Sequence, residues 1–191
     1  MKILCLGDSL TFGCDVDSQD NWVSRTACKT GLTLINKGIN GDTTGGMLAR
    51  FRLELAEDKF DAVLTMGGTN DVFVSGSTVA AKTNLVAICR QAIHLGLQPL
   101  VGIPTPMNLA MVDPTWGEVV PLTEMMTALT EYRQWLLWFE KSYGVPAIDF
   151  WAAFPESLQG VFLPDGLHPN PEGHRIMAEA LIARLPEILK S

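Results

Sequence analysis

The sequence of 191 residues has no long hydrophobic run. A membrane-spanning helix needs about 18 consecutive apolar residues, and no stretch approaches that length. The apolar run after Lys2 has about five residues, whereas the hydrophobic region of a signal peptide has roughly 7–15. We therefore expect a cytoplasmic protein without stable membrane insertion. The length fits a single domain that spans residues 1–191.

Charged residues are also scarce. They make up 18% of the chain, and 21 acidic residues against 14 basic ones give a formal net charge of −7. An acidic surface repels phosphate groups, so the composition disfavours nucleic acids and anionic membranes as partners. Apolar residues make up 47% of the chain, which is enough to fill a sizeable core and argues against disorder.

Cysteine and histidine are rare. The four cysteines, at positions 5, 14, 28 and 89, form no C-x-x-C pair and have no histidine at ligand spacing. We expect reduced, mostly buried thiols and no metal site. Of the three histidines, His94 lies late in a helical pattern and His174 in the first turn of the last predicted helix. Both positions indicate structural roles, which leaves His168 as the candidate for chemistry.

Short apolar segments alternate with helical patterns along the chain. The apolar segments are continuous, which indicates strands covered on both faces, as in a parallel sheet. The predicted strands are Lys2–Leu6, Leu32–Asn36, Asp61–Met66, Gln98–Ile103 and Val145–Asp149. The predicted helices are Asn21–Thr30, Thr44–Ala56, Val79–Leu95, Thr123–Tyr143 and a last helix capped by Asn170. Five strand-then-helix units predict an α/β sandwich with a mainly parallel sheet.

Each predicted strand is followed by a polar or glycine-rich segment. The first four are followed by "GDS", "NKGINGDTT", "GGTND" and the irregular stretch Pro104–Pro121, and "LPDGLHPN" comes after the fifth. In open α/β sheets, ligands bind outside the carboxyl ends of the strands. We therefore expect these segments to meet at one edge of the sheet.

Ser9, just after the first strand, is a candidate nucleophile, although a hydroxyl needs a base to take its proton. His168 lies in a strand-end loop, and Asp165 precedes it by three residues. An Asp at this distance can hold the imidazole in one tautomer and steady its charged form. Gly166 permits a tight turn between them, and Pro169 keeps His168 out of helical geometry. On its own, "DGLHP" also fits an ordinary turn.

Two other segments offer hydrogen-bond donors for a developing oxyanion. Asn70 in "GGTND" has a side-chain amide, and the backbone N–H of Ser9 is a further donor. In "NKGINGDTT", Gly38 and Gly41 are both candidates for a backbone donor, and Gly41 can offer its N–H with no side chain in the way. Each segment alone is typical of a turn. Their joint occurrence at strand ends predicts a catalytic site.

The segments "GDSLTFG", "NGDT", "GTND" and "DGLHPN" resemble the four sequence blocks of the SGNH hydrolases, the GDSL-type esterases and lipases. They occur in the family's order and cover residues 7–170. The resemblance implies a three-layer α/β/α sandwich with a central five-stranded parallel sheet, like that of flavodoxin. It implies a triad of Ser9, Asp165 and His168, and an oxyanion hole of Ser9, Gly41 and Asn70. No metal or organic cofactor is required.

Two features near the motif refine this hypothesis. Asp8 and Asp71 flank the catalytic positions, and we interpret them as residues that brace loops. The motif has Thr11 where the nucleophile elbow G-x-S-x-G has its second glycine, which argues against the α/β-hydrolase fold. The motif also lacks the lysine of a phosphate-binding loop, which disfavours a non-catalytic binding module for nucleotides.

The expected reaction is hydrolysis of a small or medium-chain carboxylic ester through an acyl-enzyme. Thioester or lysophospholipid hydrolysis and removal of acetyl groups from carbohydrates are the alternatives on the same site. The stretch Pro104–Pro121, together with Met125 and Met126, is a candidate wall for an acyl pocket, since methionine adapts to varied shapes. The same residues can equally serve only to pack on the sheet.

Overall fold

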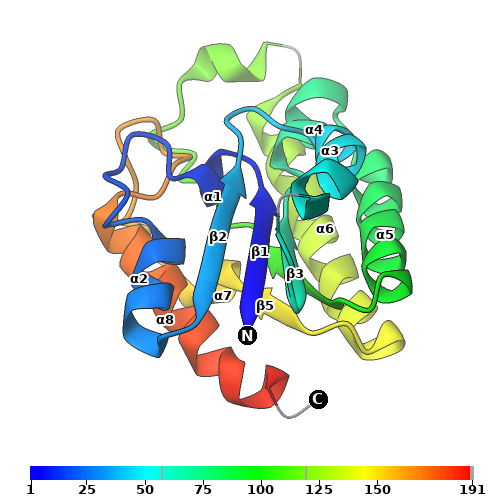
Figure 1. The fold of residues 1–191 in the computed structure, drawn as a ribbon. Helices are drawn as coiled ribbons and strands as arrows, with labels where there is room; N and C mark the ends of the chain where they lie inside the picture. The colour runs from blue at the N-terminus through cyan, green and yellow to red at the C-terminus, as the bar shows by residue number, and fades with distance from the viewer. Residues whose placement is uncertain (57, 119, 190–191) are drawn as a thin grey trace.

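A five-stranded parallel sheet lies between two layers of helices (Figure 1). The computed structural model describes residues 1–56, 58–118 and 120–189. The strand order is β2-β1-β3-β4-β5, and every neighbouring pair is parallel. The strands are β1 (Lys2–Gly7), β2 (Thr33–Gly38), β3 (Ala62–Met66), β4 (Gln98–Ile103) and β5 (Ala147–Asp149). The predicted three-layer, flavodoxin-like architecture is confirmed.

The helices connect the strands and cover the sheet. They are α1 (Ser9–Phe12), α2 (Trp22–Thr30), α3 (Thr44–Ala56), α4 (Thr69–Ser75), α5 (Val79–His94), α6 (Leu122–Tyr143), α7 (Phe150–Ala153) and α8 (Pro171–Ile188), with a 3₁₀ turn at Pro114–Gly117. Asn170 caps α8 as predicted, because its side chain accepts hydrogen bonds from the N–H groups of Glu172 and Gly173. In the part of the chain described, no helix is long and apolar enough to cross a membrane.

Both faces of the sheet are buried, which explains why its strands are continuously apolar. On β1, Ile3 and Cys5 join the core beneath α2 and α8, whereas Leu4 and Leu6 join the core beneath α3 and α5. Figure 1 shows α2 and α8 on one side of the sheet and α3, α5 and α6 on the other. A strand covered on both sides has no polar face, so alternation of polar and apolar residues disappears.

The hydrophobic pattern of the sequence does not predict the shortest helical segments. Helices α1, α4 and α7 and the 3₁₀ turn have four to seven residues each. Segments of one or two turns are too short to display a helical period, so the sequence pattern cannot reveal them. Strand β5 is shorter than predicted and begins at Ala147, after Pro146, whose ring nitrogen cannot donate to a ladder.

The register of the sheet brings the strand ends together. Gly7 at the end of β1 pairs with Gly38 on β2 and with Met66 on β3. The loops that follow these three strands therefore start side by side, at the upper edge in Figure 1. The expectation that the polar segments meet at the carboxyl edge of the sheet is confirmed for these strands.

Candidate active site

Ser9 is the first residue of the short helix α1 and is almost completely buried. Asp8 caps this helix, since its Oδ1 accepts a hydrogen bond of 3.0 Å from the N–H of Leu10. A Cβ on Gly7 would lie 2.1 Å from Thr11 Oγ1. The glycine therefore lets the chain turn back over the end of β1 and present the serine hydroxyl there.

Side chains from neighbouring elements hold α1 in place. The indole Nε1–H of Trp22 donates to the carbonyl of Leu10 at 2.9 Å. The side-chain amides of Asn21 and Asn36 both donate to the carbonyl of Thr11, at 3.0 and 2.8 Å. A four-residue helix cannot satisfy its own carbonyls, so these contacts replace the missing turn. The platform under Ser9 is thus built by residues from α2 and β2.

Ser9, His168 and Asp165 form one continuous chain of hydrogen bonds. Nε2 of His168 lies 2.8 Å from Oγ of Ser9, and Nδ1 lies 2.6 Å from Oδ2 of Asp165. The other carboxylate oxygen of Asp165 accepts the backbone N–H groups of Leu167 and His168, both at 2.9 Å. Partial burial raises the pKa of Asp165, but the hydrogen bonds from His168 and Leu167 outweigh it and lower the pKa below its usual value.

The loop that carries Asp165 and His168 is closed on itself. The N–H of Leu163 donates to the carbonyl of His168 at 2.8 Å, and Phe162 and Pro169 form an antiparallel bridge. Gly166 has a φ of +67°, and the N–H of Asn108 donates to its carbonyl at 2.7 Å. The segment after β4 therefore braces the turn between Asp165 and His168.

Two of the candidate oxyanion donors, Asn70 and Gly41, lie close to each other. One N–H of the Asn70 side-chain amide donates to the backbone carbonyl of Asp42 at 2.8 Å, next to Gly41. Gly41 has a φ of +75°, and within the described part of the chain its N–H donates no hydrogen bond. The N–H of Gly38, by contrast, donates to Asn36 Oδ1 at 2.9 Å. Of the two glycines, Gly41 thus has the available donor.

Asp8 and Asp71 brace loops, as expected. Asp71 accepts hydrogen bonds from both the N–H and the hydroxyl of Thr44, at 2.9 and 2.6 Å, and so ties α4 to the start of α3. Asp8 is fully buried, and burial together with the nearby charges of Asp42 and Asp71 raises its pKa to about 7. Its Oδ2 has no partner among the described residues.

The other histidines have structural surroundings. His94 is exposed at the end of α5. His174 is buried on α8, and its Nδ1 accepts a hydrogen bond of 3.3 Å from the backbone N–H of Trp22. Burial, assisted by the positive charge of Arg25, lowers the pKa of His174 to about 4. His174 therefore serves to join α8 to α2.

The four cysteines differ in burial. Cys5 and Cys89 are buried, Cys14 is half-buried and Cys28 is exposed, so the prediction of mostly buried thiols holds for two of the four. Partial burial and the negative charges of Asp15 and Asp165 raise the pKa of Cys14, which disfavours its thiolate. No group of three metal-ligating side chains is found among the residues that the structure describes.

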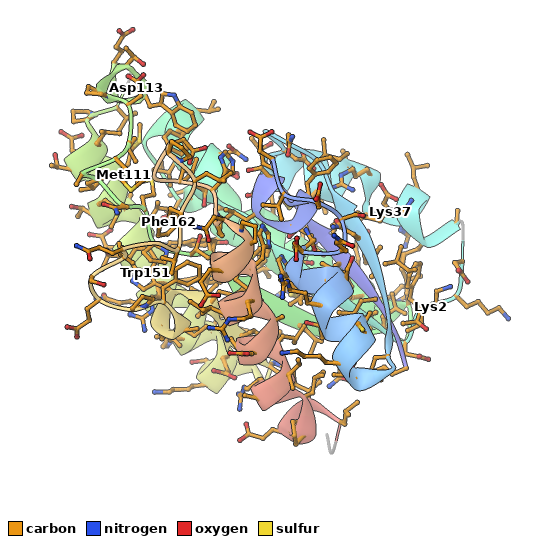
Figure 2. All side chains as sticks on the ribbon, turned by 90° about the vertical axis from the view of Figure 1, so that its left-hand side faces the viewer. Lys2, Lys37, Met111, Asp113, Trp151 and Phe162 are labelled. Carbon is orange, nitrogen blue, oxygen red and sulfur yellow. The ribbon has the colours of Figure 1, made fainter. Side chains whose placement is uncertain are left out.

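A cavity of about 700 Å³ opens beside Asp165. Its walls come from the segment after β4 and from the loop that carries Asp165, and include Leu109, Met111, Trp116 and Pro164. Figure 2 shows Met111 and Asp113 at the end of the molecule opposite Lys2, close to the loop of Phe162. The ring of Trp116 meets that of Phe73 on α4 edge to face, at 5.5 Å between centroids. The lining also includes Asp113 and Asp165, so apolar and acidic side chains face this cavity together, next to the candidate triad.

Several residues that shape the site lie outside the four sequence motifs. Arg50, Trp22 and Phe73 lie on helices, at positions that a helical pattern assigns to packing or solvent. The contacts of Arg50 with Asp42 and with the ends of β1 and β2 relate it to the site. As a whole, the arrangement can transfer a proton from a buried hydroxyl to a histidine and offer N–H donors beside it.

The chain matches the model of the GDSL-like Lipase/Acylhydrolase family over residues 5–176. It is 28% identical to the arylesterase of Vibrio mimicus, over 96% of this chain and 88% of that protein. It is 25% identical to the acetylxylan esterase of Geobacillus stearothermophilus, over 81% and 73%. A solved member of the lipolytic G-D-S-L family from Veillonella parvula has the same fold, with a TM-score of 0.79, 22% identity and coverage of 96% and 97%.

Proposed function

The chain belongs to the GDSL-like lipase/acylhydrolase family, whose members hydrolyse ester bonds, and we propose that it is a serine esterase for small or medium-chain carboxylic esters. The observation that carries this proposal is the unbroken hydrogen-bond chain from Ser9 through His168 to Asp165. The match to esterases along nearly the whole chain supports the reaction class.

In the proposed first step, Ser9 Oγ attacks the carbonyl carbon of the ester while Nε2 of His168 takes its proton. Asp165 accepts a hydrogen bond from Nδ1–H, which keeps Nε2 as the acceptor and stabilises the imidazolium. The imidazolium then protonates the departing alcohol, which leaves an acyl group on Ser9. In the second step His168 activates a water, which releases the acid and restores the serine.

The developing negative charge on the carbonyl oxygen is stabilised by three donors. These are the N–H of Ser9, the N–H of Gly41 and the second N–H of the Asn70 amide. The Ser9 N–H is the first of its helix and has no helical partner, while Asn70 uses its other N–H to hold Asp42. Donors fixed before the reaction need no reorganisation during it, which is the source of their catalytic effect.

The cavity beside Asp165 is the proposed site for the acyl chain. The apolar side chains in its lining, Leu109, Met111 and Trp116, favour a hydrocarbon chain or an aromatic ring over a bare acetyl group. Carbohydrate deacetylation is the second candidate, because one of the relatives is an acetylxylan esterase. In an acetylated sugar, the sugar is the alcohol part of the ester. We expect it to lie at the open rim of this cavity rather than deep within it.

The proposal is tested with a fluorophosphonate probe and with p-nitrophenyl butyrate. Ser9→Ala is expected to remove both covalent labelling and turnover while the protein stays folded by circular dichroism. Ser142→Ala, an exposed serine near the end of α6, is the matched control and should keep both. Full activity of folded Ser9→Ala protein would refute the proposal.

The substrate class is tested with a panel of esters. The panel varies acyl length from acetate to decanoate, and includes thioesters and acetylated xylose. We expect kcat/KM to rise from acetate to medium chains. A maximum on acetylated xylose would favour the carbohydrate deacetylase instead.

A further inference from the structure

Arg50 on α3 connects the ends of two strands to the loop that precedes its own helix. Its Nη2 donates to the carbonyl of Gly7, the last residue of β1, at 3.0 Å, and to the carbonyl of Lys37, the last residue but one of β2, at 2.8 Å. Its Nε donates to Asp42 Oδ2 at 2.9 Å, and its Nη1 donates to Glu54 at 2.9 Å. Figure 2 shows Lys37 on this part of β2. One partly buried guanidinium thus spans three segments.

The contact with Asp42 leads directly to the oxyanion side of the site. The backbone carbonyl of Asp42 accepts the Asn70 amide at 2.8 Å, so the position of Asp42 sets the orientation of that amide. Gly46 makes room for the side chain of Asp42, because a Cβ on Gly46 would lie 1.9 Å from its Oδ1. Arg50 holds the other carboxylate oxygen, Oδ2.

The contact with Gly7 leads to the nucleophile. Gly7 directly precedes Asp8, whose side chain caps the helix of Ser9. The same Gly7 carbonyl also accepts the N–H of Ile39 at 3.0 Å, so the end of β1 and the loop after β2 share one acceptor. Arg50 consequently fixes the distance between the Ser9 platform and the segment that carries Gly41.

We propose that Arg50 is a positioning residue that holds Asn70 and Gly41 in register with Ser9, acting through Asp42 and the strand-end carbonyls. This inference rests on the proposed serine esterase function. The planar guanidinium uses four of its five N–H donors here, in directions fixed by its geometry. A lysine has three donors on one nitrogen and cannot reproduce that set, even though it keeps the charge.

The test compares Arg50→Lys with a matched control, Arg184→Lys. Arg184 also joins a carboxylate, that of Glu140, to a strand carbonyl, that of Ala147, but it lies at the other end of the sheet. Concentrations are normalised to the folded fraction by circular dichroism. We expect Arg50→Lys to lower kcat for p-nitrophenyl butyrate by about 10 to 10²-fold with KM changed less than about threefold. Arg184→Lys should leave both unchanged.

A double-mutant cycle that combines Arg50→Lys with Asn70→Ala separates a positioning role of Arg50 from general structural damage. If Arg50 acts through Asn70, Arg50→Lys lowers kcat much less in the Asn70→Ala background than in the native protein. The side-chain amide resonance of Asn70 in ¹⁵N-labelled protein should also move in Arg50→Lys and stay in place in Arg184→Lys. Equal loss of kcat in both backgrounds, with an unmoved amide resonance, would overturn the inference.

A second variant covers the case in which Arg50→Lys does not fold. Asp42→Asn keeps the backbone carbonyl and an oxygen for Arg50 Nε but removes the charge. We expect the same pattern with a smaller drop in kcat, and an unchanged kcat would overturn the inference. An inactive native protein that fluorophosphonate does not label would overturn the proposed function as well. An active, labelled native protein with additive losses overturns only the role of Arg50.

Discussion

Acidification should destabilise the protein through His174. This side chain is buried, accepts the N–H of Trp22, and has its pKa lowered from 6.5 to about 4. Above about pH 6.5 the imidazole is neutral in both the folded and the unfolded chain, so its contribution is constant. As the pH falls below 6.5, only the unfolded chain binds the proton, and the free energy of unfolding decreases until the folded chain also binds it near pH 4.

The size of this effect follows from the pKa difference. One pKa unit corresponds to about 1.4 kcal/mol, so the full loss is roughly 3 kcal/mol, of which about 2 kcal/mol is reached at pH 5. Protonation of His174 should also affect the candidate active site, because Trp22 donates its indole N–H to the carbonyl of Leu10, next to Ser9. Charging His174 therefore loosens the platform of the proposed nucleophile.

Asp8 acts in the opposite direction and must be separated from His174. Its pKa is raised from 3.8 to about 7, so the folded chain keeps a proton that the unfolded chain loses. That contribution falls as the pH rises from about 4 to 7. The pH dependence of the free energy of unfolding of the native protein therefore combines the opposing contributions of His174 and Asp8.

The assay compares the native protein with His174→Asn by urea unfolding at pH 7.5 and pH 5. Asparagine can accept the Trp22 N–H with its Oδ1 and does not titrate. Asp8 is present in both proteins, so its effect cancels in the comparison. We expect the native protein to lose about 2 kcal/mol more than the variant between the two pH values. Equal losses in both proteins would refute the reasoning.

Three further outcomes are expected. Asn70→Ala should lower kcat for p-nitrophenyl butyrate by about 10²–10³-fold, because one oxyanion donor is removed, and steady-state kinetics measure this; a change below threefold would exclude Asn70 from that role. Gly166→Ala should lower the free energy of unfolding by about 1–3 kcal/mol in urea titrations, because its φ is +67° and a Cβ would lie 2.6 Å from the carbonyl of Asn108. Trp116→Ala should reduce the kcat/KM ratio of hexanoate to acetate esters by roughly tenfold; an equal effect on both esters would show that the cavity does not hold the acyl chain.

Much of the fold could be predicted from local patterns. Strand β4 and helix α3 have the predicted bounds, because a continuous apolar run and a helical period are properties of neighbouring residues. Helices α1 and α4 could not be found in this way. Their few residues are held by a cap at Asp8, by a glycine of positive φ at position 68, and by side chains from other elements.

The candidate site also has a part that local sequence predicts and a part that depends on the tertiary structure. Asp165 and His168 are three residues apart, so their pairing depends on one loop and is already implicit in "DGLHP". The spatial meeting of His168 with Ser9, 159 residues away, needs the parallel sheet to bring its first strand beside the last loop. The motifs anticipated this meeting, because each of them follows a predicted strand.

By itself, the sequence determined the order of strands and long helices along the chain. It also determined which strand ends carry polar residues and which chemical groups are available there. These are consequences of local propensity and of the spacing of residue types along the chain. Only the tertiary structure decided which of Gly38 and Gly41 has an N–H without a partner among the described residues, which cavity adjoins Asp165, and that Arg50 joins the ends of β1 and β2. Those features depend on the directions of side chains across elements, and direction between distant segments is set by packing rather than by local pattern.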